Sequence, residues 1–200
     1  MLKRAKESAN EMSISNASFN CVDVQTDDMG EEVYSAAFSR FGVMFFEDPV
    51  AAFCNINKSL ITGASLSFVC WQSPALNPWQ SLFIEAVKKY VDLPSPPPRS
   101  PSPFAFMESE YVSSILEESD FQNIKIEGHE AEVNMFSGRS LSDSVKDYIS
   151  INPVVSGMLK DSTEQEKTEI INSAIEAFSP YYSAKGLMFP SATWLVTTTK

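Results

Sequence analysis

Apolar residues recur along this chain with two spacings, one typical of helices and one typical of strands. Behind Asp48-Pro49, apolar residues return every three or four positions, and the proline suits a helix start because an N–H there would be unpaired anyway. Leu66–Trp71 is a mostly apolar run of the kind that forms a buried strand. The sequence Thr-Glu-Gln-Glu at 163–166 has the pattern of a capping box, which opens a helix.

Alternating helices and strands are expected along the whole chain. The patterns predict helices over 1–10, 48–63, 77–90, 108–119, 140–151 and 163–178, and strands over 19–24, 33–39, 66–71, 123–135 and 192–199. Such alternation favours an α/β layered fold with a mainly parallel sheet, in one domain over 1–200. Residues 94–103 hold six of the twelve prolines and are expected to form an extended surface loop.

Composition and charge exclude several classes of function. The net charge is −11, which argues against nucleic acid because phosphate binding needs clustered Lys and Arg. No apolar run approaches the length of a membrane span, and Cys21, Cys54 and Cys70 have no CxxC spacing. The single histidine, His129, alternates with glutamates on a predicted strand and is expected to be exposed. We therefore expect a cytoplasmic protein with no nucleic-acid, membrane or metal partner.

Ligands of parallel α/β sheets bind at the carboxyl ends of the strands. In this chain those ends are predicted at Asp23–Thr26, Ser39–Gly42 and Trp71–Ser73. These three short segments are therefore the first candidates for a functional site.

The segments around these strand ends also carry a family resemblance. Residues 38–53 read Phe-Ser-Arg-Phe-Gly-Val-Met-Phe-Phe-Glu-Asp-Pro-Val-Ala-Ala-Phe, and 68–72 are followed by Asn-Pro-Trp at 77–79. They resemble the fourth strand with its helix, and the fifth strand with its exit loop, of a bacterial group of class I S-adenosylmethionine-dependent methyltransferases. Phe-Ala-Phe at 104–106 and the closing strand over 190–199 fit the same pattern.

The resemblance implies a Rossmann-like sheet in the strand order 3-2-1-4-5-7-6, flanked by helices and with the last strand antiparallel. On that order the chain supplies strands three to seven, and its amino-terminal side lacks strands one and two with the glycine-rich cofactor loop. The residues agree with this, because the seven glycines are never closer than ten positions apart and no GxG can be written. The expected fold is an incomplete Rossmann-like methyltransferase sheet.

The resemblance also implies S-adenosylmethionine as the cofactor and six residues that would contact it. They are Asp23, Val24, Gln25, Ser39, Arg40 and Phe41. Asp23 would accept a hydrogen bond from the adenine amino group, and the Val24 N–H would reach the ring. An alternative stays open for two of these residues. Asp23 could be a solvated turn residue, and Arg40 could pair with a nearby carboxylate instead of lining the site.

The acceptor side of the site is implied by the same family pattern. Trp71, Gln72, Asn77 and Trp79 would lie towards a small-molecule acceptor, although packing roles are the favoured alternative for the two tryptophans. Methyl transfer is an in-line displacement in which the protein supplies position and charge environment, so no fixed catalytic base is expected.

Without strands one and two, strand four would become an exposed, apolar edge. Three arrangements could cover it: direct pairing with strand three, which we favour for an isolated chain, a partner chain, or a dimer. Two functions follow from the sequence. The first is methyl transfer to a small molecule by an incomplete methyltransferase. The second is a non-catalytic, methyltransferase-like remnant or interaction domain that does not bind the cofactor.

Overall fold

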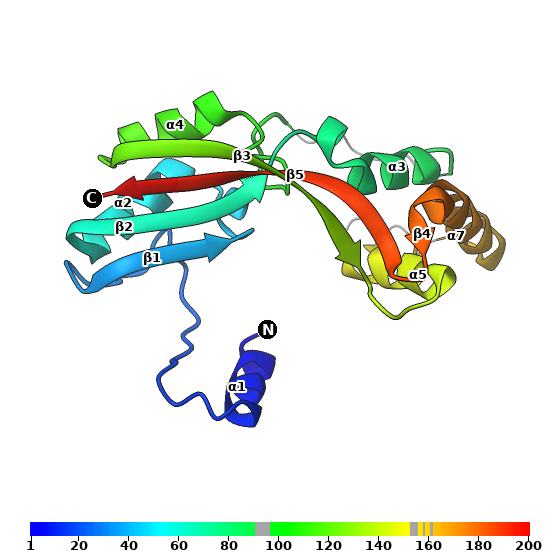
Figure 1. The fold of residues 1–200 in the computed structure, drawn as a ribbon, viewed down its shortest axis with the longest axis horizontal. Helices are drawn as coiled ribbons and strands as arrows, with labels where there is room; N and C mark the ends of the chain where they lie inside the picture. The colour runs from blue at the N-terminus through cyan, green and yellow to red at the C-terminus, as the bar shows by residue number, and fades with distance from the viewer. Residues whose placement is uncertain (91–96, 153–155, 158, 161) are drawn as a thin grey trace.

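The structure is a computed structural model that describes residues 1–90, 97–152, 156–157, 159–160 and 162–200. A single twisted sheet runs through it, in the order β1-β2-β5-β3, with the short β4 paired to β5 (Figure 1). The strands are β1 (Tyr34–Arg40), β2 (Leu60–Trp71), β3 (Gln122–Met135), β4 (Tyr182–Ser183) and β5 (Gly186–Thr199).

The strand order confirms the predicted fold class. β1 and β2 run parallel, and β5 is antiparallel to all of its neighbours. Order and directions match strands four, five, seven and six of the expected sheet, with the last strand antiparallel. β1, β2 and β3 run in the same direction, and the reversed strand β5, which lies between β2 and β3, makes every pairing except β1–β2 antiparallel among the described strands.

The strand predicted over 19–24 is not formed. The Asp23 carboxylate accepts a hydrogen bond from the Gln25 N–H, and the Asp23 N–H donates to Asp27. Such local bonds compete with a sheet ladder. The Asn55 amide also donates to Val24 O and Asp27 O, and it thereby attaches this turn to a helix. Direct pairing of strand three with strand four is therefore wrong for this structure, and β1 is an edge strand.

Helices follow the predicted capping signals closely. They are α1 (Leu2–Glu11), α2 (Pro49–Ser59), α3 (Pro78–Val87), α4 (Ser109–Glu118), α5 (Leu141–Ile151) and α7 (Glu164–Phe178), with 3₁₀ turns η1 (Val43–Phe45), η2 (Pro74–Leu76) and η3 (Ser179–Tyr181). Asp48 caps α2 by accepting from Ala51 N, and Thr163 forms the full capping box of α7. The expected helix end at Gly63 was wrong, because α2 ends at Ser59 and Gly63 lies inside β2 with φ of +78°.

The proline-rich segment predicted over 94–103 lies only partly within the described residues. Positions 94–96 fall outside them, and 97–103 consist of turns and bends with no helix or strand. Arg99 pairs with Glu108 at 2.8 Å, and its guanidinium lies 4.1 Å from the Tyr111 ring centroid. These contacts attach the described end of the loop to α4.

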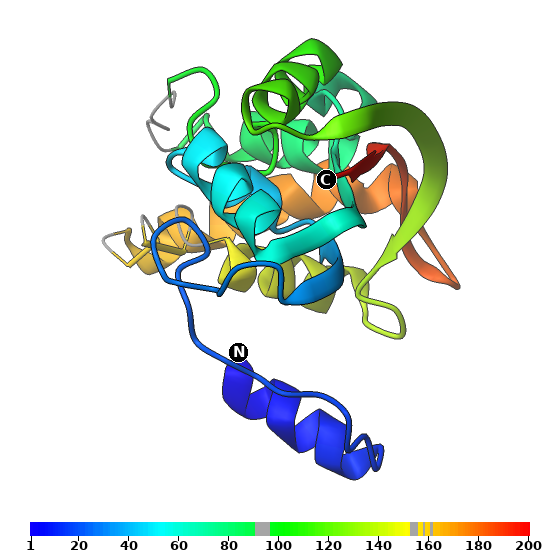
Figure 2. The ribbon, with the colours of Figure 1, turned by 90° about the vertical axis from the view of Figure 1, so that its left-hand side faces the viewer.

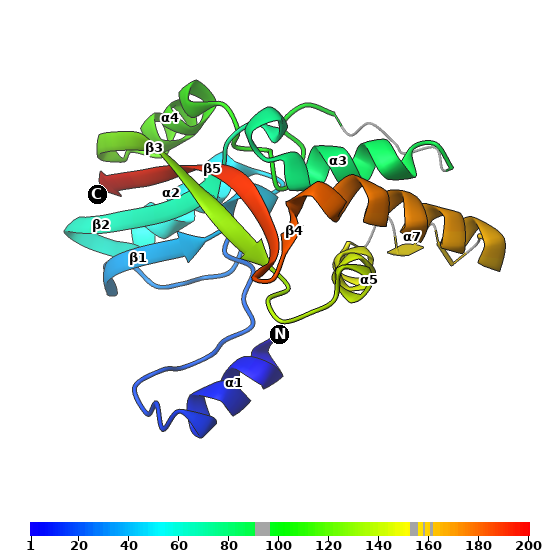
Figure 3. The same cartoon turned by 45° about the vertical axis from the view of Figure 1, so that its right-hand side comes forward.

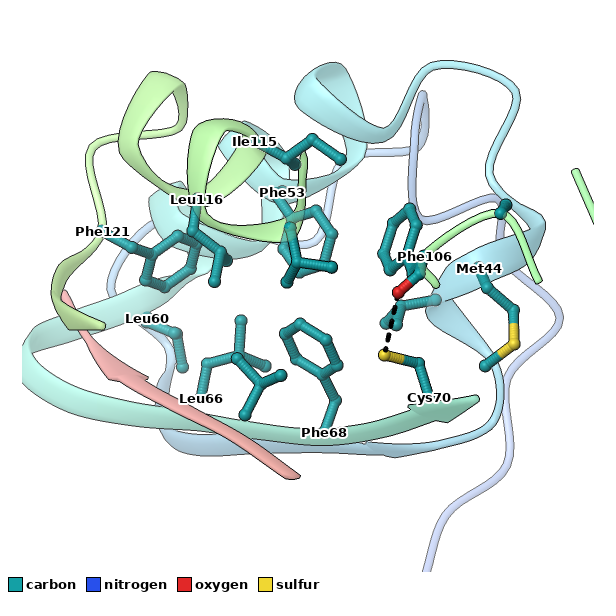
Figure 4. Packing of buried hydrophobic residues seen from close by; sticks show 14 of the residues in the cluster. Met44, Phe53, Leu60, Leu66, Phe68, Cys70, Phe106, Ile115, Leu116 and Phe121 are labelled. Carbon is teal, nitrogen blue, oxygen red and sulfur yellow. Dashed lines mark hydrogen bonds between the residues drawn. The ribbon is translucent and has the colours of Figure 1, made fainter. Parts of the chain in front are cut away.

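Two apolar cores support the sheet. The first lies between β2 and helices α2 and α4, where Phe53, Phe68 and Leu116 meet (Figure 4). The second lies between α3, α5 and α7 and the bent ends of β3 and β5 (Figure 3). Trp71, at the carboxyl end of β2, packs against both cores.

Helix α1 lies apart from the sheet and its helices (Figures 1 and 2). Its side-chain bonds are internal: Arg4 donates to Glu11 at 3.1 Å. Only Ala9 is buried in it. The main body of the fold is therefore built by the residues from β1 onward.

Candidate functional site

The two parallel strands end side by side, at Arg40 and Trp71 (Figure 1). The next residue of the first strand, Phe41, has φ of +56°, a conformation that a bulky residue rarely adopts. Its N–H still donates to Val69 O at 3.0 Å, so the sheet ladder continues through the turn. The chain thus reverses sharply at the point where ligands of α/β sheets bind.

This sharp turn places the Phe41 ring in an aromatic row. Phe41 stacks on Trp71 with ring centroids 4.2 Å apart and an interplanar angle of 16°. Trp71 meets Trp79 edge-on at 5.1 Å, and Trp79 stacks with Phe104 at 5.7 Å. Three residues predicted from the sequence, one directly after β1, one on β2 and one on α3, are therefore brought together at the carboxyl ends of the parallel strands.

Trp79 is buried and its indole N–H is unsatisfied. Its side chain is 7% exposed, and the Nε1 atom has no hydrogen-bond partner in the part of the chain that the structure describes. The ring also contacts Tyr148 of α5. Trp79 therefore acts as a packing residue in the second core, the role favoured for it from the sequence.

Gln72 and Asn77 lie beside this row but hold the backbone together. Both are buried. Gln72 donates its Nε2 to Thr193 O at 2.9 Å. Asn77 donates to Ala192 O at 3.0 Å and accepts from Ala192 N at 3.1 Å, so one amide binds both backbone groups of Ala192, whose C=O also accepts from Gln72 N. These two side chains join the loop after β2 to β5.

The remaining predicted cofactor residues form a separate group near the start of α2. Asp23 is exposed, and its Oδ1 accepts from Gln25 N at 2.9 Å. Gln25 is partly buried, and its Oε1 accepts from Asp48 N at 2.9 Å. Val24 O is held by Asn55 at 2.8 Å. Among the described residues, no hydrogen bond or ring contact joins this turn to Phe41.

Ser39 and Arg40 complete the set at the end of β1. Ser39 is partly buried beside Gly42, where an added Cβ would approach its Oγ to 3.0 Å. Arg40 is exposed and forms no ion pair within the described ranges. Its guanidinium is therefore available to a ligand or to another carboxylate.

An open groove of about 600 Å³ lies beyond the end of β2 and was not foreseen from the sequence. Its walls come from η2, β3, η3 and β5, and they include Leu76, Glu130, Glu132, Tyr181 and Pro190. The sequence does show that the two glutamates are alternate residues of a strand, so their side chains lie on the same face of β3. The groove itself depends on the pairing of β3 with β5, between residues about 60 positions apart, which the sequence pattern does not reveal.

Burial changes two titratable groups near the cores. It raises the pKa of the Cys70 thiol to about 12, and it raises the pKa of Tyr148 as well. Tyr148 donates its hydroxyl hydrogen to Gln80 at 2.9 Å. Neither group is therefore ionised near neutral pH, and both serve packing rather than acid–base chemistry.

The described residues form neither a metal centre nor a membrane-spanning helix. Within the described ranges, no three His, Cys, Asp or Glu side chains gather closely enough to hold a metal ion. None of the described helices combines the length and apolar character needed to cross a bilayer. His129 lies exposed on β3, as its alternating pattern predicts.

Comparison with known proteins gives matches only among solved structures. No protein-family model matches the chain, and no curated protein matches it. A proposed methyltransferase from Bacillus halodurans C-125 superposes with a TM-score of 0.56 at 15% identity, covering 100% of this chain and 78% of that one. The (4+2)-cyclase SpnF gives 0.54 at 15% identity, covering 100% of this chain and 62% of that one.

Phosphoethanolamine N-methyltransferase 2 from Haemonchus contortus, in complex with S-adenosyl-L-methionine, is a third similar structure. Its TM-score is 0.51 at 13% identity, and the match covers 100% of this chain but only 41% of that enzyme. At such identities the likeness concerns the fold, and a cyclase shares that fold too. Together with the sheet order, these matches show that the chain has the fold of class I S-adenosylmethionine-dependent methyltransferases.

Proposed function

We propose that this chain is part of a S-adenosylmethionine-dependent methyltransferase that acts on a small molecule. The observation that carries the proposal is the aromatic row at the carboxyl ends of β1 and β2, where Phe41 stacks on Trp71. In open α/β sheets this edge is where ligands bind. An aromatic surface there excludes water and favours a cationic centre such as a sulfonium.

The adenine end of the cofactor fits the residues present. Asp23 is exposed, and the structure records a hydrogen bond only to its Oδ1, so its second carboxylate oxygen can accept from an amino group. Val24 and Gln25 are fixed by bonds to Asn55 and Asp48. The turn is therefore held in one conformation before any ligand arrives, which lowers the entropic cost of binding.

The amino-acid end of the cofactor does not fit this chain. A close backbone approach requires glycines, and the nearest one to the site is Gly42, where a Cβ would meet Ser39 Oγ at 3.0 Å. No second glycine lies within ten positions of it. We infer that residues outside these 200 hold that end.

The cofactor, when bound, supplies the methyl group for an in-line displacement. This chain would contribute Asp23 as an orienting acceptor, Phe41 and Trp71 as a dry wall, and Arg40 as an exposed cation near the strand end. None of these groups needs to accept a proton, so the residues present support positioning and water exclusion rather than general base catalysis.

The groove beyond β2 supports a small-molecule acceptor. Its volume of about 600 Å³ is in the range of small-molecule sites. Its lining includes Leu76 and Pro78, the neighbours of Asn77, which donates a hydrogen bond to Ala192 O of β5. Glu130 and Glu132 give its rim a negative charge, which favours an acceptor carrying a cationic group.

Isothermal titration of the 200-residue chain with S-adenosylhomocysteine tests the proposal, after circular dichroism has shown that the chain is folded. We expect saturable binding with a Kd of roughly 100 µM, because the chain has residues for the adenine end of the ligand but not for its amino-acid end. Asp23→Ala should weaken it about five- to tenfold, the worth of one hydrogen bond. Asp28→Ala is the matched control, because Asp28 caps Gly30 in the same loop at 2.9 Å.

A folded chain that shows no binding at millimolar ligand would contradict this proposal. That result would support the second function, a non-catalytic domain with a methyltransferase fold. The observation that favours this alternative is the lack of any glycine pair able to admit the cofactor backbone.

A further inference from the structure

The groove beyond β2 has a floor made by two strands that continue past their neighbour. The ladder between β2 and β5 ends at Thr193, whereas β3 stays paired with β5 well beyond that point (Figure 1). On this extension Glu130 lies opposite Ala192. Two residues further along, Glu132 lies opposite Pro190. Both cross-strand partners are short and uncharged, so neither of them can neutralise a carboxylate.

Glu130 and Glu132 share one face of β3 and have no cationic partner. Val133, which points to the opposite face, packs against the second core, so the two glutamates are turned away from that core. The one lysine of β3, Lys125, also belongs to the opposite face, where it pairs with Glu127 at 3.1 Å. Among the described residues, neither Glu130 nor Glu132 takes part in an ion pair.

Another wall of the groove is apolar and held in place. It comes from Leu76 and Pro78, the neighbours of Asn77. Asn77 donates to Ala192 O and accepts from Ala192 N, so this wall is bonded directly to the floor. The Leu76 side chain nevertheless remains 46% exposed. A fixed apolar wall beside two free negative charges suits a ligand with a hydrocarbon chain and cationic groups.

The spacing of the two carboxylates favours a ligand with more than one cationic group. Alternate residues of a strand lie about 7 Å apart. The extended carbon chain of 1,4-diaminobutane separates its two nitrogens by a similar distance, so one diamine can meet both glutamates. A single cation would have to draw the two negative charges together, against their repulsion.

A divalent metal ion fits this pair of carboxylates less well than a diamine does. Calcium takes about six to eight oxygen ligands. Within the described ranges, no third His, Cys, Asp or Glu side chain joins Glu130 and Glu132 to form a metal site. The apolar wall also offers nothing to a metal ion, whereas methylene groups can pack against it.

We propose that the groove binds an aliphatic polyamine, with one ammonium group on Glu130, the next on Glu132, and the methylenes between them against Leu76 and Pro78. The inference rests on the proposed function in one respect, that the polyamine is then the methyl acceptor. A nitrogen beside a carboxylate stays protonated, so the groove holds cationic groups that do not react. Pro78 is the neighbour of Trp79 in the aromatic row, which places the groove beside that row.

The charge of the whole chain favours the same class of ligand. The sequence has 26 acidic and 15 basic residues, with a net charge of −11. A field of this sign raises the local concentration of a polycation near the surface. The field does not choose a place on the molecule, and the two unpaired carboxylates of the groove supply that choice.

NMR titration of the isotope-labelled full chain with 1,4-diaminobutane at low ionic strength tests the proposal. The matched ligand is 4-amino-1-butanol, which has a similar length and one charge fewer. We expect saturable shifts at the amides of Ala131, Ser191 and Ala192. The Kd of the diamine should be about fivefold lower than that of the amino alcohol, the worth of one further exposed ion pair.

Three variants assign this preference to the groove. Glu130→Gln and Glu132→Gln should each raise the Kd of the diamine to that of the amino alcohol. Glu127→Gln is the matched control, because it removes the same charge from the other face of the same strand, and it should keep the preference. Equal Kd values for the two ligands on the unmodified chain would overturn the proposal. An equal loss of preference in all three variants would also overturn it, since a general negative field would then hold the diamine.

This result and the titration with S-adenosylhomocysteine can fail separately. A chain that prefers the diamine but does not bind S-adenosylhomocysteine keeps the polyamine site and contradicts the methyltransferase function. A chain that binds S-adenosylhomocysteine but shows no preference for the diamine keeps that function and contradicts the polyamine site.

Discussion

At the scale of single residues, Asn77 shows how a side chain can replace a strand. β2 ends at Trp71, and just beyond it the Gln72 N–H still donates to Ala192 O of β5 at 3.0 Å. Asn77 supplies both a donor and an acceptor to that residue, at 3.0 Å and 3.1 Å, from a fully buried position. Sequence reasoning placed Asn77 towards the acceptor, and it could not foresee a bond between residues 115 positions apart.

Asn77→Ala should therefore destabilise the fold. Removing the amide leaves the buried N–H of Ala192 unpaired, while Ala192 O keeps its hydrogen bond from Gln72 N, and we expect the free energy of unfolding to fall by about 2 kcal/mol. Urea unfolding followed by circular dichroism measures it. Gln165→Ala, whose side chain bonds only to Glu169 on an exposed helix face, is the control and should change stability by less than about 0.5 kcal/mol. Equal effects of the two changes would contradict this account.

At the scale of elements, local signals predicted the helices well and long-range pairing decided the strands. Helix α7 begins where its capping box begins, and α2 begins at Pro49 behind Asp48. By contrast, β5 starts at Gly186, six residues before its predicted start, and includes Pro190. A proline is rare inside a strand because it has no N–H to donate. The pairing of β5 with β2 ends at Thr193, so Pro190 lies where β2 offers no acceptor and the missing N–H costs no hydrogen bond.

The capping box of α7 makes a pH-dependent prediction. Glu166 accepts hydrogen bonds from the Thr163 N–H and hydroxyl at 2.7 Å and 2.8 Å, and these bonds lower its pKa. A carboxyl with a lowered pKa stabilises the fold above its unfolded-state pKa, and the effect is lost as pH falls through the folded-state pKa. Thr163→Ala should cost about 1 kcal/mol at pH 7, the usual worth of a helix cap.

The same substitution should cost less at pH 3, where protonated Glu166 no longer strengthens the cap in either chain. Urea unfolding at both pH values measures the difference. Thr168→Ala lies in the same helix, where its hydroxyl donates only to Glu164 O, and it should have a small effect that does not change with pH. A cost of Thr163→Ala that grows on acidification would refute the role given to Glu166.

At the scale of the whole molecule, the sheet order could be predicted and the second core could not. The order follows from the resemblance of residues 38–53 and 68–72, since these fix which strands are neighbours. The second core arises because β3 and β5 continue past the end of β2 and bend towards α5 and α7 (Figure 3). No apolar pattern within one element states which distant helices it will meet. The groove beyond β2 could not be predicted for the same reason, because its walls come from elements that are far apart in the sequence.

Trp71 is the residue through which the two cores touch. It packs against both clusters, stacking on Phe41 on one side and meeting Trp79 on the other. Trp71→Ala should lower stability by about 3 kcal/mol and should also uncouple the cores. The remaining tryptophans report separately, because Trp194 packs against the first core and Trp79 lies in the second.

Uncoupling can be measured by urea unfolding followed by tryptophan fluorescence. In the Trp71→Ala background, chains carrying only Trp79 or only Trp194 should unfold with different midpoints, because each core then opens alone. In the Trp71→Phe background, where an aromatic ring still bridges the cores, the two midpoints should coincide, as a two-state transition requires. Coincident midpoints in both backgrounds would mean that the continuous strands β3 and β5 couple the cores without Trp71. The first and second cores would then be coupled by the backbone of β3 and β5 rather than by the Trp71 side chain.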